Sequence, residues 1–139
     1  IGLEVLSTDL VYRGFGQGGV NFLTTQGPIK TPIITNPPYG DLPRKFIKHA
    51  FRDLKVPYLA LLLKSTFFHV DKHRVLNGRY PYSREYKLSW RLDFTDEGAP
   101  TMNFSWFVWD FISPRFSPYP ETKILSKPKK PSSQQEMFT

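Results

Sequence analysis

The sequence predicts an α/β domain whose mostly parallel sheet ends in an antiparallel hairpin. Three observations predict this fold class. Residues 32–35 and 56–63 are apolar runs, and the longer one has the continuous hydrophobicity of a strand buried on both faces. Residues 42–54 lie between them and have the spacing of an amphipathic helix, the order that builds a parallel sheet. Two aromatic segments near residue 100 flank a Gly-Ala-Pro turn, as in a hairpin.

The amino-terminal part is expected to contain two strands and a flexible loop. Residues 3–10 contain four aliphatic side chains and are predicted as a strand that ends near Asp9. Residues 14–19 contain four glycines, which predicts a flexible loop. A second, short strand is predicted at residues 20–23.

The strand predicted at residues 32–35 runs directly into two prolines. Proline donates no ladder hydrogen bond and fixes φ, so the strand must stop and turn at Pro37 and Pro38. Asn36 is then left at the carboxyl end of the strand, where ligands bind in open α/β sheets. Its amide both donates and accepts hydrogen bonds, and Tyr39 adds a flat ring suited to stacking on a planar base.

The elements after this turn follow from periodicity. Residues 42–54 are predicted as a helix, with basic side chains mostly between the apolar ones, and residues 56–63 as a buried strand. Residues 65–76 are less regular and are expected to form a short helix or an active-site loop. Residues 86–94 and 103–110 are predicted as the two strands of the antiparallel hairpin.

Length and composition predict one domain and a tail. The chain has 139 residues, of which 40% are hydrophobic and 22% charged, enough for one core. We expect the folded domain at residues 1–112. Proline, serine and lysine accumulate in residues 113–139, which predicts an extended or disordered tail.

The formal net charge of +7 predicts attraction to polyanions and makes DNA or RNA the expected partner. Part of the positive charge lies in the predicted tail, at Lys123, Lys127, Lys129 and Lys130. A basic tail that is merely solvated is therefore an alternative explanation of this charge.

Several kinds of site are not expected. There is no cysteine, which excludes disulfides and thiolate metal sites. Of the histidines His49, His69 and His73, the last two are four residues apart and could share a helix face, but no third ligand or acidic pair flanks them. No metal site is therefore predicted, and solvated or phosphate-facing roles are favoured. The longest apolar stretch is too short to span a membrane, so we expect a soluble, cytoplasmic protein.

The sequence Asn36-Pro37-Pro38-Tyr39 resembles the signature loop of the S-adenosylmethionine-dependent amino-methyltransferases, best known from DNA adenine-N6 methyltransferases. The resemblance implies that the Asn36 side-chain oxygen and the Pro37 carbonyl accept hydrogen bonds from an exocyclic amino group, while Tyr39 packs on the flipped base. These acceptors localise the lone pair of a poorly nucleophilic nitrogen for attack on the methyl group. The implied function is methyl transfer to an amino nitrogen, most simply N6 of adenine in DNA.

The resemblance also implies a Rossmann-like class I methyltransferase sheet over residues 3–112, with an antiparallel last strand. In that family S-adenosylmethionine is the cofactor. Asp9 matches the acidic residue that holds its ribose, and Asn21 with Phe22 matches the position that contacts its adenine. Lys64 follows the buried strand at the edge expected for Asn36 and is a candidate substrate-binding residue.

The chain departs from the family pattern at its start. The cofactor glycine loop is expected before Leu3, where this chain begins, so the sheet is expected to be amino-terminally incomplete. The glycines at residues 14–19 follow the acidic strand instead of preceding it, and we do not assign them as the cofactor loop. Weak or absent cofactor binding by this chain is the resulting expectation.

Three alternatives remain at this point. The same four-residue loop occurs in enzymes that modify adenine or guanine in RNA, and in enzymes that methylate a glutamine side chain of translation release factors. The third alternative is a non-catalytic nucleic-acid-binding or structural module derived from the fold. The missing glycine loop favours this module, and the intact four-residue motif favours an enzyme.

Overall fold

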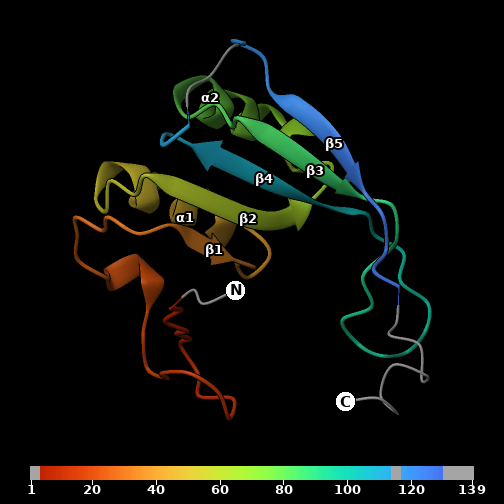
Figure 1. Cartoon of the computed structure of the whole chain (residues 1–139), viewed down its shortest axis with the longest axis horizontal. Coiled ribbons are helices and arrows are strands. Elements are labelled where there is room, and N and C mark those ends of the chain that lie inside the picture. Colours follow the sequence, from red (N-terminus) through yellow and green to blue (C-terminus); the bar gives the residue numbers. More distant parts are fainter. Residues whose placement is uncertain (1–3, 114–116, 130–139) are drawn as a thin grey trace, which may run out of the picture.

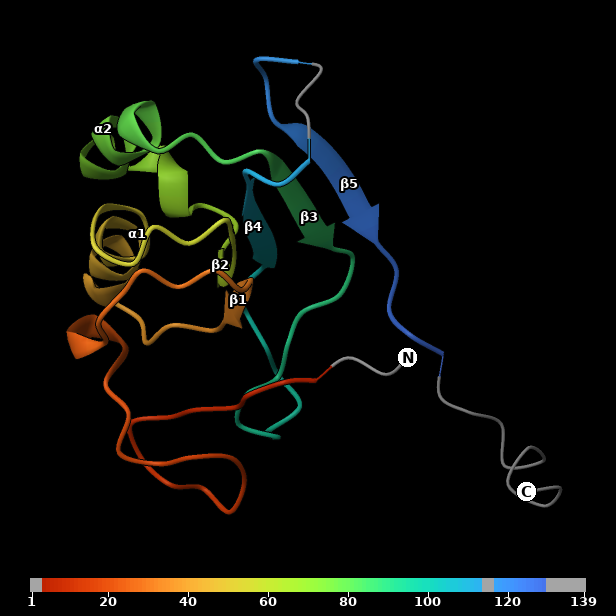
Figure 2. The same cartoon turned by 60° about the vertical axis from the view of Figure 1, so that its left-hand side comes forward.

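The computed structural model describes residues 4–113 and 117–129, which form one mixed sheet with two helices on one of its faces (Figures 1 and 2). The elements in chain order are the 3-10 turn η1 (Phe22–Thr24), β1 (Ile33–Thr35), α1 (Leu42–Arg52), β2 (Tyr58–Lys64), the 3-10 turn η2 (Phe67–His69), α2 (Asp71–Arg79), β3 (Arg84–Leu88), β4 (Phe104–Asp110) and β5 (Glu121–Leu125). The α/β class is thus confirmed.

The sheet has the strand order β1-β2-β4-β3-β5. The outer pairings, β1 with β2 and β3 with β5, are parallel, whereas β4 runs antiparallel to both of its neighbours, β2 and β3. The prediction of a mostly parallel sheet is therefore wrong: the sheet is mixed, and its central pairings are antiparallel. The reason is the position of β4. The sequence pattern predicts that β4 pairs with β3, but it does not predict that β4 lies between β3 and β2.

The core lies between the helices and the sheet. Helix α1 begins one residue after Asp41, has Pro43 in its first turn, where a missing N–H costs nothing, and ends two residues before the predicted boundary. Its apolar stripe packs against one face of the central strands. The fully buried members of this cluster include Ile47, Ala50, Leu54, Leu59, Leu61 and Trp109.

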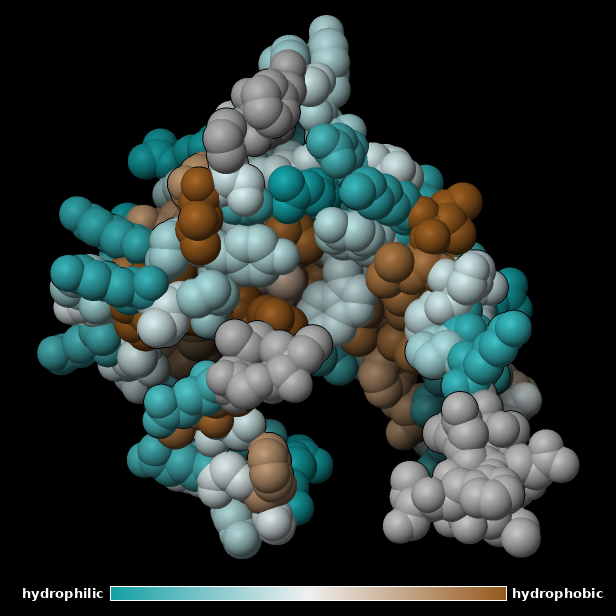
Figure 3. Space-filling model, in the orientation of Figure 1, coloured by the Kyte–Doolittle hydropathy of each residue, from teal (hydrophilic) through white to brown (hydrophobic). Residues whose placement is uncertain are grey.

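The opposite face of the sheet carries no helix from the described part of the chain (Figure 2). Ala60, Leu62 and Val108 point to this face and are buried, with Trp106 and Tyr86 as cross-strand neighbours. Figure 3 views this face and shows hydrophobic surface near its middle. The sheet is thus apolar on both faces although only one is covered by helices.

The predicted amino-terminal strands are absent from the described residues. Residues 4–10 pair with no strand and contribute only an isolated bridge between Thr8 and Gln17. Val5 and Leu6 remain 77% and 82% exposed. In place of the short strand at residues 20–23, the chain forms η1. Residues 7–10 share four backbone hydrogen bonds with residues 17–20, among them Asp9 N–H to the Gln17 carbonyl at 2.9 Å, but these close a local loop and do not extend into a strand ladder.

The predicted hairpin strands are found as antiparallel neighbours, but the first one lies earlier than expected. Strand β3 ends at Leu88, and the chain then loops through residues 89–103 before β4. Within this loop, Asp93 accepts hydrogen bonds from Gly98 N–H at 2.6 Å and from Thr95 N–H at 3.1 Å. These local bonds compete with strand pairing and account for the shorter strand.

Strand β5 lies in the segment for which an extended or disordered tail was expected. It pairs with β3 from Arg84 opposite Glu121 to Leu88 opposite Leu125, and all five of its residues are exposed. This part of the predicted tail is therefore an extended edge strand. Residues 114–116 and 130–139 of the predicted tail lie outside the described residues.

The predicted solvated or phosphate-facing role of His73 is wrong. The side chain is only 6% exposed, and its ring stacks on Phe67 with centroids 3.9 Å apart. His73 belongs to α2, which the sequence pattern allowed as a short helix in residues 65–76. None of the helices formed by residues 4–113 and 117–129 is long and apolar enough to cross a bilayer.

Candidate functional site

The candidate site lies at the carboxyl ends of β1 and β2, and we call this end of the two strands the sheet edge. These strands are parallel, with Thr35 opposite Leu61, so Asn36 follows β1 at the edge where Lys64 ends β2. Lys64 is paired with Phe104, the first residue of the antiparallel β4. The predicted position of the motif at the carboxyl end of a parallel strand is confirmed.

Asn36 presents an uncommitted amide at this edge. The residue is exposed, and its side chain forms no hydrogen bond with any of the described residues. Pro37 is buried and anchors the turn, whereas Pro38 is exposed. The rigid proline pair thus holds a free donor and acceptor at the surface without using either for its own structure.

Tyr39 lies in a small aromatic cluster. Its ring centroid is 6.1 Å from that of Phe104 and 6.5 Å from that of Phe94, and these two phenylalanines are 5.2 Å apart. Phe104 is 2% exposed, whereas Tyr39 is 50% exposed. One side of the tyrosine is thus supported by buried aromatic surface, and much of the side chain remains accessible to a ligand.

Lys64 is the cation of this cluster. Its Nζ lies 5.8 Å from the centre of the Tyr39 ring, within the range of a cation–π contact. The structure therefore brings together Asn36, Tyr39 and Lys64, three of the residues singled out from the sequence. The sequence analysis did not identify Phe94 and Phe104 as part of the site. They lie 55 or more positions after Tyr39, and nothing in their local sequence pattern indicates a contact with it.

The loop that carries Phe94 is held by its own hydrogen bonds. The Gly98 N–H bonded to the Asp93 carboxylate, together with contacts from Thr95, lowers the pKa of Asp93 below its usual value although burial acts in the opposite direction. Arg91 donates from Nε to the side-chain oxygen of Asn103 at 3.2 Å. Phe94 thus reaches Tyr39 from a loop with a defined internal structure.

Polar groups connect β2 to β4 at the same edge. The hydroxyls of Ser65 and Ser105 are 2.8 Å apart, and the Ser65 N–H donates to the carbonyl of Asn103 at 3.0 Å. These bonds join the residue after Lys64 to the start of β4. They fix Lys64 and Phe104 side by side and so help to define the position of Tyr39.

The residues expected to bind the cofactor do not join this site. Asp9 accepts from the Val11 N–H at 3.3 Å and lies 3.6 Å from Arg13 Nε. Asn21 caps η1 by accepting from the Leu23 N–H at 3.0 Å. Each polar side chain thus serves the local turn that contains it.

Phe22 has a structural role of the same kind. Its ring stacks on Phe46 of α1 with centroids 4.4 Å apart and meets His49 edge-on. Asp9, Asn21 and Phe22 thus serve a turn, a cap and a packing contact in this structure, and their role in binding S-adenosylmethionine stays a prediction. Within residues 4–113 and 117–129, there is also no cluster of three His, Asp or Glu side chains that would hold a metal ion.

The side chains at this sheet edge can bind a ligand by hydrogen bonding, stacking and charge. An exposed amide, an accessible aromatic ring on an apolar support and a lysine are suited to a planar, hydrogen-bonding ligand that carries negative charge nearby. Comparisons with protein-family models, with curated proteins and with solved structures find no match to this chain.

Proposed function

We propose that the loop at residues 36–39 binds an adenine base through its N6 amino group, as the substrate site of an N-methyltransferase acting on DNA. The observation that carries this proposal is the placement of Asn36 and Tyr39 at the carboxyl end of β1. There the amide is uncommitted and the ring is half exposed against Phe94 and Phe104. Hydrogen bonding and stacking are the two contacts by which an extruded base is recognised.

In this proposal each group has one task. The Asn36 Oδ1 and the Pro37 carbonyl accept the two N6 hydrogens, which reduces delocalisation of the nitrogen lone pair into the ring. Tyr39 stacks on the base, and Lys64 attracts a neighbouring phosphate. S-adenosylmethionine is the proposed methyl donor.

A second candidate is a nucleic-acid-binding module without catalysis. The observation in its favour is the engagement of all three expected cofactor residues in local packing or capping. RNA bases and a glutamine side chain also present amino groups to such a loop. The net charge of +7 supports a nucleic acid over a peptide, because phosphates are attracted to a basic surface.

Two measurements on the 139-residue chain separate these candidates. The first is transfer of a labelled methyl group from S-adenosylmethionine to mixed-sequence DNA, to RNA and to a glutamine peptide, followed by identification of the modified atom. The second is an NMR titration with adenosine and with N6,N6-dimethyladenosine, which lacks both N6 hydrogens and is the matched control.

Transfer to N6 of adenine that depends on Asn36 supports the enzyme. Adenosine binding at Asn36 and Tyr39 that the dimethylated nucleoside fails to reproduce supports the base-binding role of the loop. It supports the binding module over the enzyme if S-adenosylmethionine, titrated in the same way, binds the chain and no transfer follows. Equal binding of both nucleosides, or shifts remote from Asn36, contradicts the proposed role of the loop in either candidate.

A further inference from the structure

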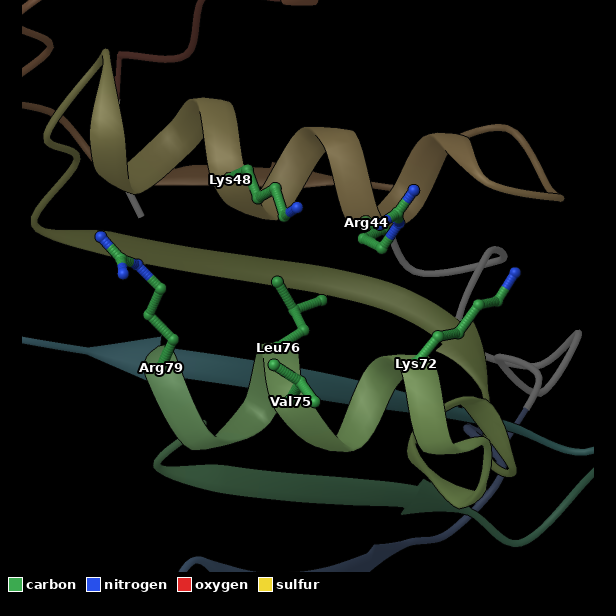
Figure 4. Close-up of a pocket in the computed structure, with 6 residues that line it drawn as sticks. All are labelled: Arg44, Lys48, Lys72, Val75, Leu76 and Arg79. Carbon is green, nitrogen blue, oxygen red and sulfur yellow. The ribbon is translucent and has the colours of Figure 1, made fainter.

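A second basic site lies between the two helices. Arg44 and Lys48 of α1, with Lys72 and Arg79 of α2, surround a groove of about 170 Å³, whose apolar part is formed by Val75 and Leu76 (Figure 4). It lies on the helix side of the sheet, whereas Tyr39 contacts Phe104, which by the alternation of β4 lies on the other face with Trp106 and Val108.

The groove has a large excess of positive charge. Among the described carboxylates, only Asp41 approaches its cations: it accepts from Arg44 Nε at 3.1 Å and Nη2 at 2.9 Å, and lies 3.7 Å from Lys72 Nζ. Lys48 and Arg79 have no carboxylate partner in the part of the chain that the structure describes. Unpaired cations that face one another are unfavourable without a counterion, so the groove is electrostatically suited to an anion.

Arg79 is also held in place. Its guanidinium lies 5.6 Å from the centre of the Tyr80 ring, and its Nε donates to the Tyr80 hydroxyl at 3.2 Å. These contacts leave the terminal nitrogens free among the described residues and reduce the number of orientations that the side chain must lose on binding. The cation at the far end of the groove is thus partly preorganised.

The dimensions favour a chain of phosphates over an enclosed small molecule. A volume of about 170 Å³ is below the ~300–1,000 Å³ of sites that enclose small ligands. Lys72 and Arg79 are two helical turns apart, about 10 Å along α2. A groove of this length can contact more than one phosphate of a strand, which fits a chain of phosphates.

We propose that this groove binds the sugar-phosphate backbone of a nucleic-acid strand, with Lys48 and Arg79 as its main phosphate contacts. The choice of nucleic acid as the polyanion rests on the proposed function, but the site is distinct from the loop at residues 36–39. Asp41 stands two residues after Tyr39 and contacts Arg44 and Lys72 at one end of the groove. A strand that leaves Tyr39 around this edge of the sheet would enter the groove there.

The test compares two double variants of the full chain. Lys48→Ala with Arg79→Ala removes two groove cations, whereas Lys45→Ala with Arg74→Ala removes one exposed cation from each of the same helices outside the groove. Fluorescence anisotropy with labelled single-stranded and duplex DNA, at several salt concentrations, gives affinity and its salt dependence. Thermal unfolding checks that both variants are folded.

We expect the groove variant to bind more weakly and the slope of log affinity against log salt to become shallower by about 1.4 for single strands or 1.8 for duplex. The control variant should leave the slope nearly unchanged. An unchanged slope in the groove variant, or an equal change in both variants, overturns the proposal. Displacement of DNA by poly-glutamate at equal charge concentration would also overturn it, because an acidic polypeptide would then fit equally well.

The outcomes are separable from those for the proposed function. A shallower salt slope in the groove variant, combined with no discrimination between adenosine and its dimethylated form, would support the groove and contradict the base site. Discrimination between adenosine and its dimethylated form, combined with an unchanged salt slope in the groove variant, would support the base site and contradict the groove.

Discussion

The Nζ of Lys64 lies 5.8 Å from the centre of the Tyr39 ring, although the two residues are 25 positions apart in the chain. The parallel pairing of β1 and β2 brings them together, because it places the carboxyl ends of both strands at one edge. A positive charge is thereby held over one part of an aromatic surface on which a base would stack. The first two predictions concern this pair.

Replacement of Lys64 with methionine should reduce the salt dependence of DNA binding. If Lys64 contacts one phosphate, the slope of log affinity against log salt should become shallower by about 0.9 for duplex DNA. Lys30 precedes β1, at the opposite end of the strand, and Lys30→Met is the matched control. Equal slopes for both variants, measured by anisotropy, would show that Lys64 makes no phosphate contact.

Tyr39→Ala should weaken binding of single-stranded DNA, whereas Tyr39→Phe should retain most of it. Base stacking on an aromatic side chain contributes about 1–3 kcal/mol, which corresponds to about 5- to 150-fold in affinity. Phenylalanine keeps the ring against Phe104 and Phe94 and removes only the hydroxyl. A similar loss in both variants, in the same titration, would indicate that the hydroxyl and not the ring makes the contact.

Asn36→Leu should abolish any methyl transfer, with a loss of about 100- to 1,000-fold, because one preorganised polar contact to the reacting group is removed. Asn36→Asp retains two acceptor oxygens and should keep more of the rate. Single-turnover transfer to labelled adenine DNA measures both. A leucine variant that retains a tenth or more of the rate would rule out Asn36 as an acceptor for the amino group.

Leu61→Ala should destabilise the fold by about 2–5 kcal/mol, since this leucine is fully buried between the sheet and the helices. Ile34→Ala, in the neighbouring strand, removes a side chain that is 67% exposed and should have little effect. Urea unfolding of the two variants provides the comparison. Similar midpoints would show that the helices do not pack on this face of β2.

Asp53→Asn should make stability less dependent on pH between about 4 and 2. Hydrogen bonds from Arg52, and then from His49, lower the pKa of Asp53 from 3.8 to about 2. The ionised carboxylate therefore stabilises the fold above pH 4, and this contribution is lost as pH falls through 2. Denaturant unfolding at several pH values tests this expectation.

Asp71→Asn is the control for that experiment, because the Asp71 side chain is 99% exposed. If both variants have the same pH dependence, the contacts of Asp53 with Arg52 and His49 do not form in solution. A flatter profile for Asp53→Asn alone supports them.

The sequence predicted the parts of the fold in which periodicity and burial agree. The amphipathic pattern before residue 54 and the apolar run after it became α1 and β2, and the proline pair correctly located the end of β1. Asn36, Tyr39 and Lys64 could therefore be placed at one edge in advance. Pro37 and Pro38 set where β1 stops.

The sequence did not predict features that depend on distant partners. Whether residues 4–10 form a strand depends on a neighbouring backbone and not on their aliphatic pattern. The contact of Phe94 with Tyr39 depends on how residues 89–103 fold back. The sequence also did not predict that Asn21 caps η1 or that Phe22 stacks on Phe46. These contacts use the same side chains that a cofactor would need.

The insertion of β4 between β2 and β3 also has a kinetic consequence. In the described sheet β4 is the one strand that joins the pair β1-β2 to the pair β3-β5. Its register with β2 extends to Tyr58 opposite Asp110, a separation of 52 positions. Closing such a loop is entropically unfavourable until many contacts form together, so the docking of β4 is expected to limit the folding rate. A nascent chain that ends before residue 104 would contain β1, β2 and β3 but neither β5 nor the strand that joins β3 to β2.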